Sequence, residues 1–429
     1  MTAERTTALG GEREVPVPDA IARDYLLLAL RLDQHVPGTV DGYFGPAALK
    51  AQVDMEQLRS PARLAEDAAM LRSRLPDEIL EDGARRHWLD VQLVALETLA
   101  RTKAGEAVPY LDQVTGCFAF TPSRTPDPRL QAAADALDGL LDGPGSLAER
   151  LAAEDARWTV PPERLTTVVD ALVPRYRAWA ATHYPMPPHE DLRVSLVHDQ
   201  PWSGYNWYDG GYRSRVDFNL DLPVRLPSFV GTVAHETYPG HHLEHARKEQ
   251  VLVEELGHLE ASVLVINTPE CFISEGLANL GRELVVPPTD RPALLAELAS
   301  VAGLALADDQ HGLQDAASRQ SLVAGHRQVL DESRLNAALM LHADGLPRDQ
   351  VLSYLIEVGR FDPATAAKRI EFIEHPLWRL YIHVYFEGEQ LLRRWLHLVP
   401  EADRPARFGR LLAEPHTPRS IQAEIDAAD

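Results

Sequence analysis

The chain has 429 residues, of which 45% are hydrophobic and 25% charged, a composition typical of a globular protein with a large core. Its 42 basic and 64 acidic side chains give a formal net charge of −22, which repels phosphate backbones and anionic lipid. We therefore expect neither nucleic acid nor a membrane surface as a partner. The two cysteines, Cys117 and Cys271, lie far apart in sequence, which excludes a disulfide framework and a cysteine zinc site.

Residues 1–20 contain no apolar core, so we expect a flexible N-terminus without a signal peptide. No stretch approaches the ~18 apolar residues of a membrane span, and the expected location is cytoplasmic. Helical periodicity begins at 19–34 and is followed by a turn-rich loop, 35–46. Further helices are predicted near 62–74, 84–103, 129–142, 146–156 and 162–181.

The middle of the chain has a different pattern. Residues 192–199 alternate and are rich in β-formers, and 204–223 place Asp-Gly-Gly between two alternating aromatic runs, which predicts a hairpin. Helical patterns return afterwards and continue over 255–427. We expect a mainly α fold with a small β-sheet inserted upstream of a histidine cluster. The N-terminal part, 21–190, and the remainder, 191–429, should form one compact body.

The histidine cluster, residues 235–242, reads "HETYPGHH". In the zinc motif H-E-x-x-H the two histidines stand one helical turn apart and the glutamate faces the reacting water. Here His235 and Glu236 fit the start of that motif, but the second histidine is His241 or His242. On a regular helix, a spacing of six turns the side chain by about 600°, and a spacing of seven separates the residues by about 10 Å, so neither reaches the same ion.

Pro239 and Gly240 offer a solution to this spacing. Proline kinks a helix, and glycine accepts backbone angles that other residues avoid. Two looped-out residues would bring His241 to the usual place of the second histidine. A third ligand should come from another helix, and "CFISEGLANLGREL" (271–284) offers Glu275 near the start of an apolar run, with Ser274 or Thr268 as its cap.

"HETYPGHHLE" followed by "SEGLA" resembles a bacterial family known as domain of unknown function 885, with the pattern H-E-x-x-P-G-H and then E-G-x-A. Members of that family look like distant relatives of the gluzincin group of zincin metallopeptidases. The resemblance implies a zincin-like helical body that holds one Zn²⁺ ion through His235, His241 and Glu275. It also implies Glu236 as general base and leaves His242 beside the ligands or facing the substrate.

The resemblance extends to "YIHVYFEGEQLL" (381–392), which is similar to a family helix with a tyrosine three residues before a glycine. It implies that Tyr385 hydrogen-bonds the developing oxyanion, with Tyr381 on the same face as the alternative. Many family members have E-G-W-A-x-Y, whereas this chain has Leu277 and Leu280 in place of Trp and Tyr. The resemblance therefore carries over the metal ligands rather than the substrate.

Two hairpin residues are further candidates for substrate contact. Tyr208 would line the substrate cleft if the sheet lies above the metal, although packing within the hairpin is the simpler interpretation. Arg213 would hold a substrate carboxylate, although surface charge is the simpler role.

These patterns predict a zinc-dependent hydrolase that acts on a small peptide or amide, in the manner of a carboxypeptidase or a short-peptide hydrolase. Two alternatives stay open: a non-peptidase metallohydrolase of a small amide or ester, and a non-catalytic helical protein with a structural metal. The sequence specifies neither the substrate nor the oligomeric state.

Overall fold

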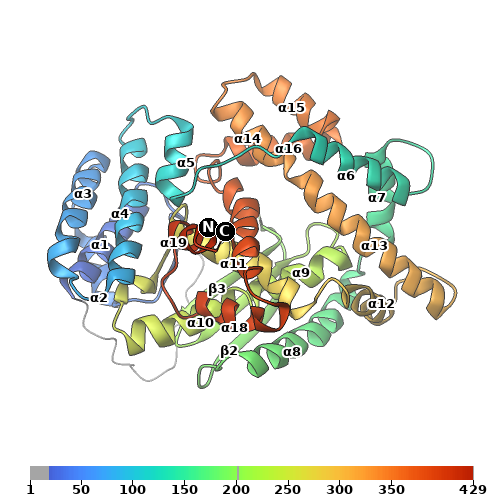
Figure 1. Ribbon diagram of the computed structural model, residues 1–429, viewed down its shortest axis with the longest axis horizontal. Coiled ribbons are helices and arrows are strands. Elements are labelled where there is room, and N and C mark those ends of the chain that lie inside the picture. Colours follow the sequence, from blue (N-terminus) through green and yellow to red (C-terminus); the bar gives the residue numbers. More distant parts are fainter. Residues whose placement is uncertain (1–18, 201, 429) are drawn as a thin grey trace.

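The computed structural model describes residues 19–200 and 202–428 and is mainly helical, as predicted (Figure 1). The expected flexible segment, 1–20, lies outside the described residues except for Asp19 and Ala20, which cap and begin the first helix. Across these described ranges, no helix combines the length and apolar character needed to cross a bilayer.

The N-terminal helices form one flank of the molecule, drawn in blue and cyan in Figure 1. Side-chain caps from Asp19, Ser60 and Asp82 start three of them. The five helices are α1 (Ala20–Asp33), α2 (Ala47–Met55), α3 (Pro61–Glu78), α4 (Gly83–Lys103) and α5 (Tyr110–Phe118). Three of them match the predicted elements, whereas α2 and α5 are short and were not predicted.

A second group of helices forms the opposite flank and the lower edge in Figure 1. Its members are α6 (Asp127–Leu140), α7 (Leu147–Arg157), a 3₁₀ turn η1 (Pro162–Arg164), α8 (Leu165–His183), α12 (Arg291–Val301), α13 (Gln310–Asp331), α14 (Ser333–His342), α15 (Arg348–Glu357) and α16 (Pro363–Glu374). The predicted helices near 129–142, 146–156 and 162–181 are confirmed as α6, α7 and α8.

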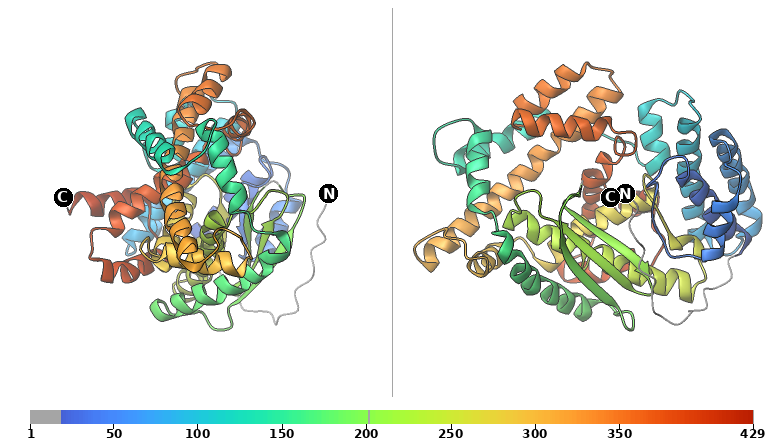
Figure 2. Two further views of the ribbon diagram at one scale, coloured as in Figure 1. Left: turned by 90° about the vertical axis from the view of Figure 1, so that its right-hand side faces the viewer. Right: turned by 180° about the vertical axis from the view of Figure 1, so that it is seen from behind.

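The small sheet predicted in the middle of the chain is confirmed. It consists of β2 (Asp191–Val197), β3 (Gly204–Gly210) and β4 (Arg213–Asn219). β4 lies in the centre, antiparallel to β3 in the predicted hairpin and parallel to β2. The right-hand view of Figure 2 shows this sheet between the two helical flanks, and it packs on α9 and α10.

A second, two-stranded sheet joins the N-terminal helices to the centre of the molecule. β1 (Val40–Tyr43) pairs antiparallel with β5 (Val263–Val265). β1 lies in the segment that was predicted as a loop. The strand was not predicted because it has only 4 residues and no regular alternation of burial, so it leaves no local signal. This pairing places residues from the start of the chain beside the histidine cluster.

The central elements carry the histidine cluster and the segments packed around it (Figure 1). They are α9 (Leu226–Glu236), α10 (His241–Lys248), a π-helical turn η2 (Glu249–Glu255), a 3₁₀ turn η3 (Leu259–Ser262), α11 (Pro269–Val285), a second π-helical turn η4 (Val384–Gly388), α17 (Glu389–Leu396), a 3₁₀ turn η5 (Glu401–Asp403), α18 (Arg404–Leu411) and α19 (Pro418–Asp426). Helix α11 contacts α9, η4 and α17 and is therefore the scaffold of this region.

Candidate metal centre

The cluster "HETYPGHH" spans the end of one helix and the start of the next. α9 ends at Glu236, and α10 begins at His241, with Gly240 as its N-cap residue. A Cβ atom on Gly240 would lie 1.9 Å from the carbonyl oxygen of His235, so only glycine fits this approach. The expected break at Pro239 and Gly240 is therefore confirmed, and it returns His241 to the side of His235.

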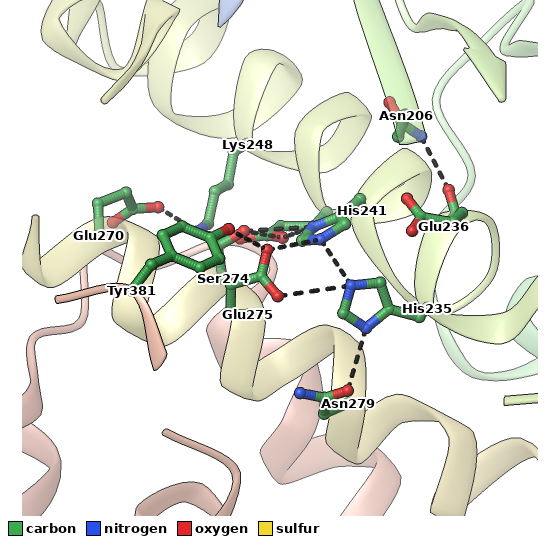
Figure 3. A network of polar contacts seen from close by, with 11 residues as sticks. Asn206, His235, Glu236, His241, Lys248, Glu270, Ser274, Glu275, Asn279 and Tyr381 are labelled. Carbon is green, nitrogen blue, oxygen red and sulfur yellow. Dashed lines mark hydrogen bonds and ion pairs between the residues drawn. The ribbon is translucent and has the colours of Figure 1, made fainter. Parts of the chain in front are cut away.

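Three side-chain atoms from three helices converge at this break (Figure 3). Nε2 of His235 lies 3.1 Å from Nε2 of His241. The carboxylate of Glu275, in α11, lies 3.5 Å from Nε2 of His235 and 3.4 Å from Nε2 of His241. Ligand atoms at tetrahedral positions about 2.0–2.1 Å from a zinc ion stand about 3.3 Å apart. In the triangle of these three side chains each histidine faces a different oxygen of Glu275, and the spacings are close to those between ligand atoms of one zinc ion.

Two of these three groups, His235 and Glu275, are in the protonation state that binds a cation. Burial, together with the charge of His241, lowers the pKa of His235 to about 4, which leaves its ring neutral. Burial opposes ionisation of Glu275, but hydrogen bonding from His241 and the charge of His235 hold the pKa of Glu275 at about 2. Oε2 of Glu275 is buried and lacks a hydrogen-bond partner within the described chain. A neutral imidazole and a carboxylate with an unsatisfied oxygen are the forms that bind zinc. His241 differs: burial opposes its protonation, but its hydrogen bonds to Glu244 and Glu275 raise its pKa well above the ordinary value, so it has to release a proton when an ion binds.

Hydrogen bonds on the outer side of each ligand fix its orientation. Nδ1 of His235 lies 3.2 Å from Oδ1 of Asn279, and Tyr381 donates its hydroxyl to Glu275 over 2.7 Å. Nδ1 of His241 faces Oε2 of Glu244 at 3.3 Å. In both histidines the partner on Nδ1 therefore leaves Nε2 to point into the centre.

Glu244 is held in turn by a buried polar chain that reaches α4, and Figure 3 shows its members Ser274, Lys248 and Glu270. It accepts hydrogen bonds from Ser274 over 2.7 Å and from Lys248 over 2.7 Å. Lys248 also pairs with Glu270, which accepts the indole N–H of Trp88 in α4 over 2.8 Å. Because these bonds occupy Glu244, we assign it to supporting His241 rather than to binding an ion.

Glu236 lies next to the triangle. Its carboxylate is within 4.8 Å of the ring nitrogens of His235 and His241. Burial raises the pKa of Glu236 to about 7, and the charge of Glu275 contributes to the same shift. Its backbone carbonyl accepts the amide of Asn206, in β3, over 2.8 Å. A carboxylate with a pKa near neutrality is suited to take up and release a proton.

The two tyrosines that were predicted as alternatives for the oxyanion hydrogen bond, Tyr381 and Tyr385, have different surroundings. Tyr381 is buried and its hydroxyl is used by Glu275, so it orients a ligand instead of facing the substrate. Tyr385 is half-buried in η4, with its ring edge-on to Tyr381 at a centroid distance of 5.2 Å. Burial and the charge of Glu275 raise the pKa of Tyr385, so its hydroxyl stays protonated beside the triangle and can donate a hydrogen bond.

Three of the candidate substrate residues lie away from the centre. His242 is fully buried between Ser214, at 2.8 Å, and Glu190, at 2.9 Å, because one step along α10 turns its side chain about 100° from that of His241. Tyr208 is buried and donates its hydroxyl to Glu249. Arg213 is exposed beside the hairpin turn. The structure does not support substrate contact by any of the three.

Sequence reasoning missed several residues around the centre. Asp41, in β1, accepts the hydroxyl of Tyr205 and raises the pKa of Glu236 through its charge, behind the larger effects of burial, His241 and Glu275. No local pattern signals it, because it is about 200 residues distant in sequence. Glu244 carried a signal, since it follows His241 by three residues and therefore shares its helix face.

Comparisons with known proteins add little to this picture. No family model matches the chain, and no curated protein matches it. Among solved structures, the chain is similar to one described as "the putative lipoprotein from Colwellia psychrerythraea", at 15% identity and a TM-score of 0.49, over 96% of this chain and 77% of that one. A likeness at this level assigns neither a family nor a function, and the resemblance to domain of unknown function 885 stays a prediction.

Proposed function

We propose that the protein is a zinc-dependent hydrolase with a zincin-like body that cleaves a peptide or a related amide bond. The observation that carries this proposal is the triangle of His235, His241 and Glu275 with Glu236 beside it. A zinc ion held by the three side chains would polarise a substrate carbonyl and lower the pKa of water at the site. The His-Glu helix beside a small sheet, with the third ligand on a later helix, agrees with the zincin-like arrangement.

The residues around the triangle supply the proton transfers. Glu236 accepts a proton from the attacking water at its carboxylate and delivers that proton to the leaving nitrogen. The hydrogen bond from Asn206 fixes the backbone of Glu236 during both steps. Tyr385 donates its hydroxyl to the carbonyl oxygen as negative charge develops there. A short-peptide hydrolase or a carboxypeptidase fits this set of residues.

One alternative is a metallohydrolase of a small non-peptide amide or ester, which would use the same groups. Another is a structural metal site. The position of Glu236 favours catalysis over a structural role, because a structural site has no need of a further buried carboxylate within 4.8 Å of its histidine nitrogens.

Metal analysis and two groups of variants test the proposal. Purified protein should contain one zinc ion per chain, which His241→Ala should lose and His242→Ala should retain. His311→Ala is a matched control, because His311 is exposed and pairs only with Asp315 in the described structure. A protein without stoichiometric zinc would contradict the proposal.

Activity should be measured on a panel of dipeptides, non-peptide amides and esters. Glu236→Gln should keep its zinc but lose at least ~100-fold in kcat, since a general base contributes about that factor. Full activity in Glu236→Gln would refute the mechanism. Turnover of esters or non-peptide amides without peptides would favour the alternative metallohydrolase.

A further inference from the structure

Arg334 lies near the proposed site with an unusual lack of partners. It is in the first turn of α14, half-buried, and its guanidinium lies 5.6 Å from the ring centroid of Phe386. In the part of the chain that the structure describes, Arg334 forms no ion pair and no hydrogen bond. Buried cations are ordinarily paired because an uncompensated charge in the interior is costly.

Hydrogen bonds and ring contacts lead from the triangle toward Arg334. Tyr381 donates to Glu275, and Tyr385 packs edge-on against Tyr381. Phe386, the next residue in η4, lies under the guanidinium of Arg334. The carbonyl of Tyr385 also accepts the amide of Asn279 over 3.2 Å. Burial raises the pKa of Tyr385 most, and Tyr385 is close enough to both Glu275 and Arg334 for the charge of each to shift that pKa as well, upward from Glu275 and downward from Arg334.

The electrostatic surroundings leave Arg334 uncompensated. Burial lowers the pKa of Arg334 to about 10, and the like charge of Arg369, in α16, adds to this shift. Asp331 acts in the opposite direction, but it forms no ion pair with Arg334 among the described residues. Arg369 lines a polar cavity of about 160 Å³ that Asp331 and Asp362 also line, and its own Nε is buried without a hydrogen-bond partner in the described structure. Among the described residues, neither guanidinium group forms an ion pair with a carboxylate.

The net charge of the chain makes a local cation significant for binding. The whole chain is acidic, with a net charge of −22, so an anionic ligand is repelled except near a local cation. Arg334 and the neighbouring Arg369 provide such positive charge near Tyr385.

We propose that Arg334, assisted by Arg369, binds a carboxylate of the substrate, so that the preferred substrates carry a free carboxylate near the bond that is cleaved. Guanidinium groups bind carboxylates through two parallel hydrogen bonds, and this pairing offsets the cost of the buried charge. This inference rests on the proposed function for the reaction, but the binding of the carboxylate does not require turnover. Arg334 acts here as a specificity residue that contacts the substrate.

Equilibrium binding tests this inference apart from catalysis. The probes are 3-phenylpropionate and its uncharged counterpart 3-phenylpropanol, titrated by calorimetry into the zinc-loaded protein. Wild-type protein should bind the acid more tightly than the alcohol. Arg334→Gln should weaken binding of the acid about 10- to 100-fold and leave the alcohol unchanged, since a hydrogen bond to a charged group contributes about that factor. Arg348→Gln is the matched control, because Arg348 is exposed and pairs with Glu374 at 3.2 Å.

Two further variants separate a failure of this inference from a failure of the proposed function. Arg334→Lys, which retains the charge without the two-pronged geometry, and Arg369→Gln should each show a smaller loss, and they replace Arg334→Gln if that variant does not fold. Equal binding of the acid by wild type and the Arg334 variants would overturn the inference, because the zinc ion alone would then account for it. Selective loss of acid binding in a protein that hydrolyses no amide would support this inference and refute the proposed function.

Discussion

Gly240 stands at the break between α9 and α10, and replacing it with alanine tests whether this break sets the position of His241. A Cβ atom on Gly240 would lie 1.9 Å from the carbonyl oxygen of His235 and 2.6 Å from that of Ala234. Non-bonded heavy atoms are most favourable at about 3.5 Å, and both opposing atoms belong to the backbone. The break therefore has to open by on the order of 1 Å to admit the methyl group.

The opening displaces His241, which directly follows Gly240. Because ligand distances in metal sites hold to about 0.2 Å, Gly240→Ala should weaken zinc binding at least ~10-fold. Overpacking should also lower the free energy of unfolding by about 1–3 kcal/mol. Urea unfolding followed by circular dichroism measures the second effect, and competition with a chromophoric chelator measures the first.

Gly325→Ala provides the matched control. Gly325 lies inside α13, and a Cβ atom there meets no atom within 4 Å. Alanine is a better helix former, so this variant should gain up to about 1 kcal/mol and keep its zinc affinity. If Gly240→Ala unfolded at the wild-type urea concentration and bound zinc with wild-type affinity, the role assigned to the break would be refuted.

Glu244→Gln should weaken zinc affinity about 10- to 100-fold, because Glu244 orients His241, and an unchanged affinity would limit Glu244 to helix packing. Burial opposes ionisation of Glu190, but hydrogen bonds led by that from His242 hold its pKa at about 2, below the ordinary 4.5. The ionised form therefore stabilises the fold above pH 4.5, and this contribution is lost as the pH falls toward 2. Glu190→Gln should cost about 2–3 kcal/mol at pH 7 in urea unfolding, and a difference from wild type that did not shrink toward acid pH would contradict this assignment. Removal of zinc by a chelator should lower the Tm of the wild-type protein. The corresponding loss in the free energy of unfolding is about 4 kcal/mol if free zinc stood at 1,000 times Kd, and His241→Ala should show no chelator effect.

Much of the helical fold could be predicted because its signals are local. α1 begins at the predicted cap Asp19, and the hairpin of β3 and β4 forms around the predicted Asp-Gly-Gly. The pairing of β1 with β5 could not be predicted, because the partners are more than 200 residues apart and the strands have only 4 and 3 residues. Short elements stabilised by distant partners leave little trace in their own sequence.

The candidate site likewise has residues that could be predicted from local sequence and residues that could not. Its triangle could be proposed because two members lie in one contiguous cluster and the third on a helix nearby in sequence. The spacing between His235 and His241 does not fit a regular helix, so it required a break at Pro239 and Gly240. Asp41 and Arg334 carried no pattern, since their positions depend on how the flanks meet the centre. For His242 the sequence left two positions open, beside the ligands or facing the substrate, because it does not show which neighbour, here Glu190, contacts its ring.

Helix α11 supplies one ligand and also the groups that hold the other two. Glu275 belongs to the triangle, Asn279 faces His235, and Ser274 donates to the glutamate that faces His241. A shift of this one helix would therefore move Glu275 and, through Asn279 and Ser274, the hydrogen-bonded supports of both histidines at the same time. Because Lys248 and Glu270 link Glu244 to Trp88 in α4, a displacement of the N-terminal flank would also reach the centre through these side chains.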